Sequence, residues 1–79
     1  MYTLLIIEDV ADVNAMLCEF FTQAGYNVLS AKDGAEGLEK FQSSNIDFIV
    51  LDIMLPFIDG RQLLKEIRAK SDIPVLMLS

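Results

Sequence analysis

Short, continuously apolar segments alternate along the chain with segments in which apolar residues recur every three or four positions. The continuous runs are typical of strands that are buried on both faces, and the helical spacing is typical of amphipathic helices. With one helix between each consecutive pair, four strands are predicted, at Thr3–Ile7, Asn27–Ala31, residues 46–51 and residues 74–78. This β-α-β-α-β-α-β order predicts a parallel sheet with right-handed crossovers and helices on both faces.

The predicted helices are bounded by residues that commonly cap helices. Gly25 follows the first helix, as a residue in the left-handed conformation does. Asp33, with a glutamate three residues later, has the form of a capping box, and Asp59 is placed to cap the third helix. The segment 53–59 contains a proline and is predicted to be a loop. The side chains expected to face the core are Val13, Met16, Leu17, Phe20, Phe21 and Ala24 in the first helix, Ala35, Leu38 and Phe41 in the second, and Leu63, Leu64 and Ile67 in the third.

Length and composition indicate one small domain in a reducing compartment. The chain has 79 residues, and 53% of them are hydrophobic. Its apolar runs are too short to span a membrane, and residues 1–7 lack the basic leader of a signal peptide. Cys18 is the single cysteine and cannot form an internal disulfide, which favours a cytoplasmic location.

The charged residues restrict the possible chemistry. Twelve acidic residues against six basic ones give a formal net charge of −6, which argues against direct binding of a nucleic-acid backbone. The absence of histidine excludes Ser-His-Asp and Cys-His catalysis, histidine-type zinc sites and a phosphohistidine donor within this chain. Acidic residues must therefore carry any chemistry, and carboxylates suit hard cations such as Mg²⁺.

Polar residues follow three of the predicted strands. Glu8 and Asp9 follow the first, Asp52 the third and Ser79 the fourth. The carboxyl ends of parallel strands lie along one edge of a sheet, where open α/β folds bind ligands. If the first and third strands are adjacent, the three carboxylates converge, and their mutual repulsion favours a bound Mg²⁺ ion. Met54 would contribute only through its backbone carbonyl.

Simpler interpretations exist for the single residues. Asp9 is also placed to cap the first helix, and Glu8 alone resembles an ordinary solvated loop residue. Asp52 is harder to explain in this way, because it follows a strongly apolar strand and precedes a loop instead of a helix.

Three segments together resemble the successive signatures of receiver domains of two-component response regulators. They are residues 4–9 (LLIIED), 50–60 (VLDIMLPFIDG) and 73–79 (IPVLMLS), and the middle one is the most specific. The resemblance implies an α/β fold of the flavodoxin-like (CheY-like) kind, a doubly wound parallel sheet, with residues 1–79 as the β-α-β-α-β-α-β portion of a (βα)5 receiver.

The resemblance also implies roles for individual residues. Asp52 is the phosphoacceptor, Asp9 resembles the acid that binds Mg²⁺ directly, and Glu8 resembles its neighbour that reaches the ion largely through water. Met54 stands where a main-chain carbonyl completes the protein ligands. Ser79 stands where the family places a hydroxyl that moves onto the phosphoryl group. The implied partner is a sensor histidine kinase, and the chain is expected to act as a phosphoryl acceptor and switch, not as a conventional enzyme.

The family continues past the fourth strand with a fourth helix, a fifth strand that carries a lysine, a fifth helix and, in regulators of transcription, an effector domain that binds DNA. Lys32 and Lys40 belong to the second α/β unit and do not match that lysine. The sequence is therefore expected to be a receiver truncated after its fourth strand. Such a chain is expected to be phosphorylated slowly or undetectably, because it lacks that lysine. It is also expected to associate as a homo-oligomer, with DNA contacted only through the effector domain.

Other classes of protein fit less well. A haloacid-dehalogenase-type phosphatase needs a second aspartate two residues after its nucleophile, where this chain has Met54. A dinucleotide-binding domain needs a glycine-rich turn after the first strand, and residues 8–13 contain no glycine. The remaining alternative is a truncated, non-signalling fragment that acts only by self-association or by binding a partner.

Overall fold

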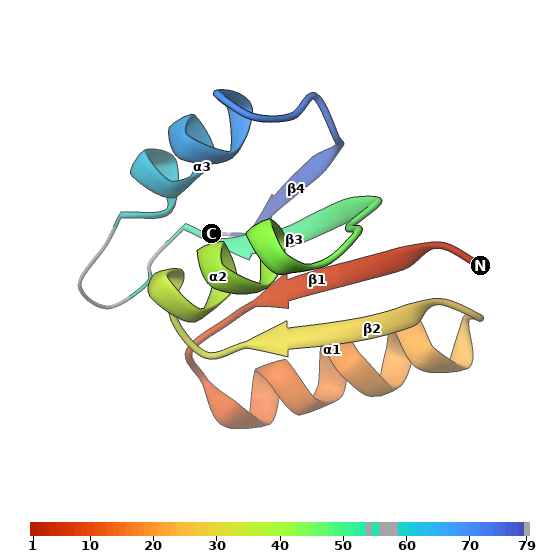
Figure 1. Ribbon diagram of the computed structural model, residues 1–79. Helices are drawn as coiled ribbons and strands as arrows, with labels where there is room; N and C mark the ends of the chain where they lie inside the picture. The colour runs from red at the N-terminus through yellow and green to blue at the C-terminus, as the bar shows by residue number, and fades with distance from the viewer. Residues whose placement is uncertain (54, 56–58, 79) are drawn as a thin grey trace.

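The computed structural model describes residues 1–53, 55 and 59–78. Within them, strands and helices alternate as the hydrophobic pattern predicts (Figure 1). The elements in chain order are β1 (Thr3–Ile7), α1 (Ala11–Gln23), β2 (Asn27–Ala31), α2 (Gly34–Ser43), β3 (Phe48–Asp52), α3 (Gly60–Arg68) and β4 (Val75–Leu78). None of the helices in this described part of the chain is long and apolar enough to cross a membrane.

The four strands form one parallel sheet in the order β2-β1-β3-β4. After β1 the chain first adds β2 on one side and then crosses to β3 on the other. The strand order therefore reverses between β1 and β3, where Ile7 is the partner of Leu51. Open α/β sheets bind ligands at the carboxyl ends of strands at such a reversal.

Helices cover both faces of the sheet, with α2 and α3 on one side and α1 on the other (Figure 1). Successive residues of a strand point to opposite faces, so each strand contributes to both halves of the core. The half under α2 and α3 is built from Leu5, Ile7, Ala31, Ile46, Ile49, Leu51, Leu55, Leu63 and Ile67. The half under α1 is built from Leu4, Ile6 and Val50, against which Leu17, Cys18, Phe21, Tyr26, Val28, Phe48 and Leu78 pack.

The predicted caps are confirmed. The Asp33 carboxylate accepts a hydrogen bond from the N–H of Glu36 (2.8 Å), and Asp59 accepts one from the N–H of Arg61 (2.8 Å). Gly25 has a φ of 101°, the left-handed conformation that glycine adopts without steric cost.

The prediction for the inner face of α1 was partly wrong. Met16 and Phe20 were expected in the core, yet 60% and 64% of their surfaces are exposed. The side of α1 that meets the sheet carries Leu17 and Phe21, so the apolar stripe is wider than the surface it covers. The ring of Phe20 instead packs edge-on against Phe21, with 5.1 Å between centroids. Ala24 and Ala35 are exposed as well.

Two strand boundaries also differ from the prediction. The third strand begins at Phe48, two residues later than expected, and includes Asp52, which pairs with Leu78. The fourth begins at Val75 instead of residue 74. Pro74 has no N–H to donate, but its carbonyl accepts a hydrogen bond from the N–H of Ile49 (3.1 Å).

Candidate metal and phosphoacceptor site

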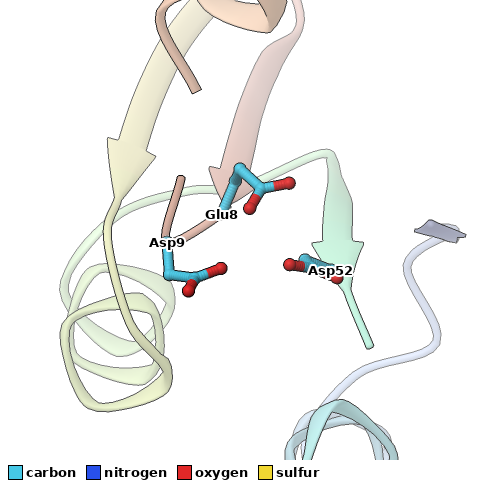
Figure 2. A group of neighbouring side chains, drawn as sticks. All are labelled: Glu8, Asp9 and Asp52. Atoms are coloured by element: carbon cyan, nitrogen blue, oxygen red, sulfur yellow. The ribbon is translucent and has the colours of Figure 1, made fainter. Parts of the chain in front are cut away.

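Three carboxylates meet at the reversal of strand order. Glu8 and Asp9 directly follow β1, and Asp52 is the last residue of the adjacent strand β3. One carboxylate oxygen from each residue lies within 4.8 Å of the other two. Figure 2 shows the carboxylates of Asp9 and Asp52 directed toward each other, beside that of Glu8. The predicted convergence of these residues is confirmed as geometry.

Glu8 is buried, with only 6% of its surface exposed. Burial raises the pKa of its carboxyl above the ordinary value of 4.5, and the neighbouring carboxyls of Asp52 and Asp9 add to the rise. The N–H of Val10, which donates to the Glu8 carboxylate (3.1 Å), acts in the opposite direction. A buried carboxylate beside two others is the environment that a divalent cation relieves.

The simpler interpretations of Glu8 and Asp9 do not agree with the structure. Helix α1 has Val10 at its N-cap position and no side-chain cap, so Asp9 does not serve as its cap. The side chain of Asp9 is exposed at the mouth of the cluster, whereas Glu8 is buried and is not a solvated loop residue.

Close backbone packing surrounds Ile53, the residue after Asp52. The N–H of Ile53 donates to the carbonyl of Leu78 (2.9 Å), and the N–H of Gly60 donates to the carbonyl of Ile53 (3.0 Å). A Cβ atom on Gly60 would lie 2.5 Å from the Cα of Ile53 and 2.8 Å from the carbonyl oxygen of Asp52. The first turn of α3 therefore packs directly against the backbone of Asp52 and Ile53.

Two predicted site residues, Met54 and Ser79, lie outside the described residues. Sequence reasoning missed one polar residue beside the site, Asn14 of α1, whose amide donates to the carbonyls of Glu8 (3.0 Å) and Ala31 (3.1 Å). No local sequence signal pointed to these contacts, because their partners lie six and seventeen positions away.

The donor set fits Mg²⁺. All three side chains offer carboxylate oxygens, which are hard ligands, and Mg²⁺ is commonly held by one or two carboxylates together with water. Asp9 is exposed, so solvent reaches the cluster from its side.

Comparison with known families identifies the class of protein. Residues 4–79 match the response regulator receiver domain, so the chain belongs to that family. It is a receiver domain of the two-component response regulators, and the predictions of family and fold class are confirmed.

Curated relatives agree with this assignment. "Response regulator RR06" of Streptococcus pneumoniae is 46% identical over 76 residues, which are 96% of this chain and 35% of that protein. The "uncharacterized transcriptional regulatory protein YcbL" of Bacillus subtilis is 43% identical over 75 residues, 95% of this chain and 33% of that protein. The chain thus spans about a third of the length of these relatives.

Solved structures share the fold. The chemotaxis protein CheY4 of Vibrio cholerae superposes with a TM-score of 0.93 at 32% identity, covering 98% of this chain and 67% of that one. The response regulator protein TrrA, in a complex with histidine kinase ThkA, gives 0.93 at 35% identity, covering 100% and 69%. TrrA of Thermotoga maritima in complex with Mg(2+)-BeF gives 0.86 at 28% identity, covering 100% and 88%.

Proposed function

We propose that this receiver domain accepts a phosphoryl group on Asp52 from a sensor histidine kinase, with Mg²⁺ held by Glu8, Asp9 and Asp52. One observation carries the proposal: Asp52 ends β3 at the reversal of strand order, with the two other carboxylates within 4.8 Å. The histidine kinase named with TrrA and the Mg(2+)-BeF bound to TrrA support the choice of donor and cofactor.

In this proposal Asp52 is the nucleophile. One of its carboxylate oxygens attacks the phosphorus in line and forms an O–P bond while the P–N bond to the kinase imidazole breaks. The electron pair of the broken bond stays on the imidazole nitrogen, and the product is an acyl phosphate on Asp52. When bound, Mg²⁺ neutralises negative charge on the carboxylates and on the phosphoryl oxygens.

The other residues hold and complete the site. Following the family resemblance, we assign direct contact with Mg²⁺ to Asp9 and contact through water to Glu8. By the same resemblance, Met54 would supply a backbone carbonyl to the ion, and the hydroxyl of Ser79 would move onto the phosphoryl group. The chain thereby acts as a switch that assists its own phosphorylation and dephosphorylation.

The proposed setting follows from the same resemblance. We place the protein in the cytoplasm, where its kinase presents the phosphohistidine. The transcriptional names among the relatives suggest an output at DNA through an effector domain, because this acidic segment is poorly suited to bind DNA itself.

Incubation with a small phosphodonor, followed by intact-mass measurement, tests the proposal. We expect slow addition of one phosphoryl group with Mg²⁺ and none with EDTA. Asp52→Asn should abolish the addition, whereas Asp72→Asn, at an exposed aspartate in the loop before β4, should leave it unchanged. Equal modification of wild type and Asp52→Asn, or equal modification with Mg²⁺ and with EDTA, would contradict the proposal.

We also propose that the 79-residue chain self-associates as a homo-oligomer. Phe20 on α1 and Leu76 on the edge strand β4 are 64% and 53% exposed. Val75 and Met77 pack on the α2–α3 side, so Leu76 alternates to the face that carries α1. Edge strands and exposed apolar surface both favour association. Because the chain belongs to the receiver family, we propose self-association in addition to phosphoryl acceptance and not in place of it.

A further inference from the structure

Asn14 joins the ends of two strands next to the acidic cluster. Its side-chain Nδ2 donates to the carbonyl of Glu8 (3.0 Å) and to the carbonyl of Ala31 (3.1 Å), the last residue of β2. The same carbonyl of Ala31 accepts the N–H of Glu8 (3.0 Å). The backbone of Glu8 is therefore held on both sides, through its N–H and through its carbonyl.

The orientation of the Asn14 amide is fixed by its surroundings. Its Oδ1 accepts a hydrogen bond from the thiol of Cys18 (3.3 Å), and both hydrogens of Nδ2 have carbonyl acceptors. A flipped amide would place its oxygen against two carbonyl oxygens and its NH₂ against the thiol. The hydrogen-bond network thus selects one orientation. The backbone of Asn14 is anchored as well, because its N–H donates to the carbonyl of Val10 (2.8 Å).

The carbonyl that Asn14 holds belongs to the peptide group between Glu8 and Asp9. This peptide is oriented by ψ of Glu8 and φ of Asp9. A change in either angle that the other does not compensate moves the two carboxylates relative to each other. Mg²⁺ requires nearly ideal octahedral geometry at about 2.0–2.1 Å, which makes its binding sensitive to small displacements of its ligands. A hydrogen bond to this carbonyl therefore restricts the backbone movements that would change the spacing of the carboxylates.

We propose that Asn14 is a positioning residue that holds the Glu8–Asp9 peptide in the conformation that binds Mg²⁺, without touching the ion itself. This inference rests on the proposed function and assigns to its site a residue that the family motifs do not include.

The test compares Mg²⁺ affinity with stability in the absence of Mg²⁺. Asn14→Leu removes both donors on a similarly branched side chain, and Asn14→Ala removes them without adding bulk or charge. The matched control is Asn27→Leu, because the Asn27 amide also bridges β2 and β1, through Thr3 (3.3 Å), at the opposite end of the same strand pair. NMR titration with MgCl₂ reads the dissociation constant from folded molecules alone, and thermal unfolding in EDTA reads stability.

We expect both Asn14 variants to raise the Mg²⁺ dissociation constant about tenfold or more, the usual effect of removing a group that orients metal ligands. Asn27→Leu should lower stability slightly and leave the Mg²⁺ dissociation constant unchanged. If Asn14→Leu fails to fold, Asn14→Ala decides the question. Wild-type affinity in a folded Asn14 variant would overturn the positioning role alone. A lack of saturable Mg²⁺ binding by wild type would overturn the proposed metal site and this inference together.

Discussion

Replacement of Gly60 by alanine tests whether the first turn of α3 supports the backbone behind Asp52. In most helices this substitution stabilises, by up to about 1 kcal/mol, because alanine has the higher helix propensity. At Gly60 the added Cβ would lie 2.5 Å from the Cα of Ile53, 2.8 Å from the carbonyl oxygen of Asp52 and 3.0 Å from that of Ile53. All three are backbone atoms, so no side-chain rotation relieves the contact.

The predicted loss follows from these two opposing effects. Overpacking a close contact costs about 1–3 kcal/mol, and the propensity gain offsets up to about 1 kcal/mol of it. Because the contacts are with backbone atoms at 2.5–3.0 Å, the cost should lie at the upper end of its range. After the offset we expect Gly60→Ala to lower the free energy of unfolding by about 2 kcal/mol. The displaced backbone carries Asp52, so the Mg²⁺ affinity should fall as well.

Urea unfolding followed by circular dichroism measures the stability change. Gly37→Ala is the matched control, because its Cβ would meet the Cδ1 of Ile7 at 2.5 Å, an atom at the flexible end of a side chain. Adding Ile7→Val removes that atom and should recover part of the loss in Gly37→Ala, whereas it should not rescue Gly60→Ala. A Gly60→Ala protein as stable as wild type would refute the close-packing argument.

The remaining predictions concern protonation and assembly. Because the pKa of Glu8 is raised in the folded state, the folded protein binds more protons than the unfolded chain between 4.5 and that raised pKa. In EDTA the contribution of Glu8 to the free energy of unfolding should therefore fall as pH rises through that window, and Glu8→Gln should remove this pH dependence. Urea unfolding measures it. Equal pH dependence of wild type and Glu8→Gln would contradict a raised Glu8 pKa. Light scattering of wild type should give a mass above that of the monomer. Leu76→Lys should lower the measured mass, whereas Tyr2→Lys, at another exposed apolar residue, should not. A monomeric wild type would reject self-association.

The sequence was sufficient to predict how the strands bring the carboxylates together. Strands of a parallel sheet end at one edge, so the positions of Glu8, Asp9 and Asp52 after apolar runs were enough to expect convergence. The condition that β1 and β3 be adjacent is met in the structure. Helix starts were predictable for the same local reason, because Asp33 and Asp59 cap through amides two or three residues away.

Features that depend on distant contacts were not predictable. The burial of Glu8 arises from tertiary packing, although its local sequence resembles a solvated loop. Asn14 is one polar position of an amphipathic helix until the fold brings Ala31 to it. The exposure of Phe20 depends on how much of α1 the sheet can cover, which helical periodicity does not determine.

Locating the phosphoryl group tests the central claim most directly. After incubation with a small phosphodonor and Mg²⁺, borohydride reduces an acyl phosphate to an alcohol, and peptide mapping then identifies the modified side chain. We predict that aspartate is converted to homoserine at position 52 and that Glu8 and Asp9 remain unmodified. Conversion at Glu8 or Asp9 in place of position 52 would contradict the assignment of Asp52 as the phosphoacceptor.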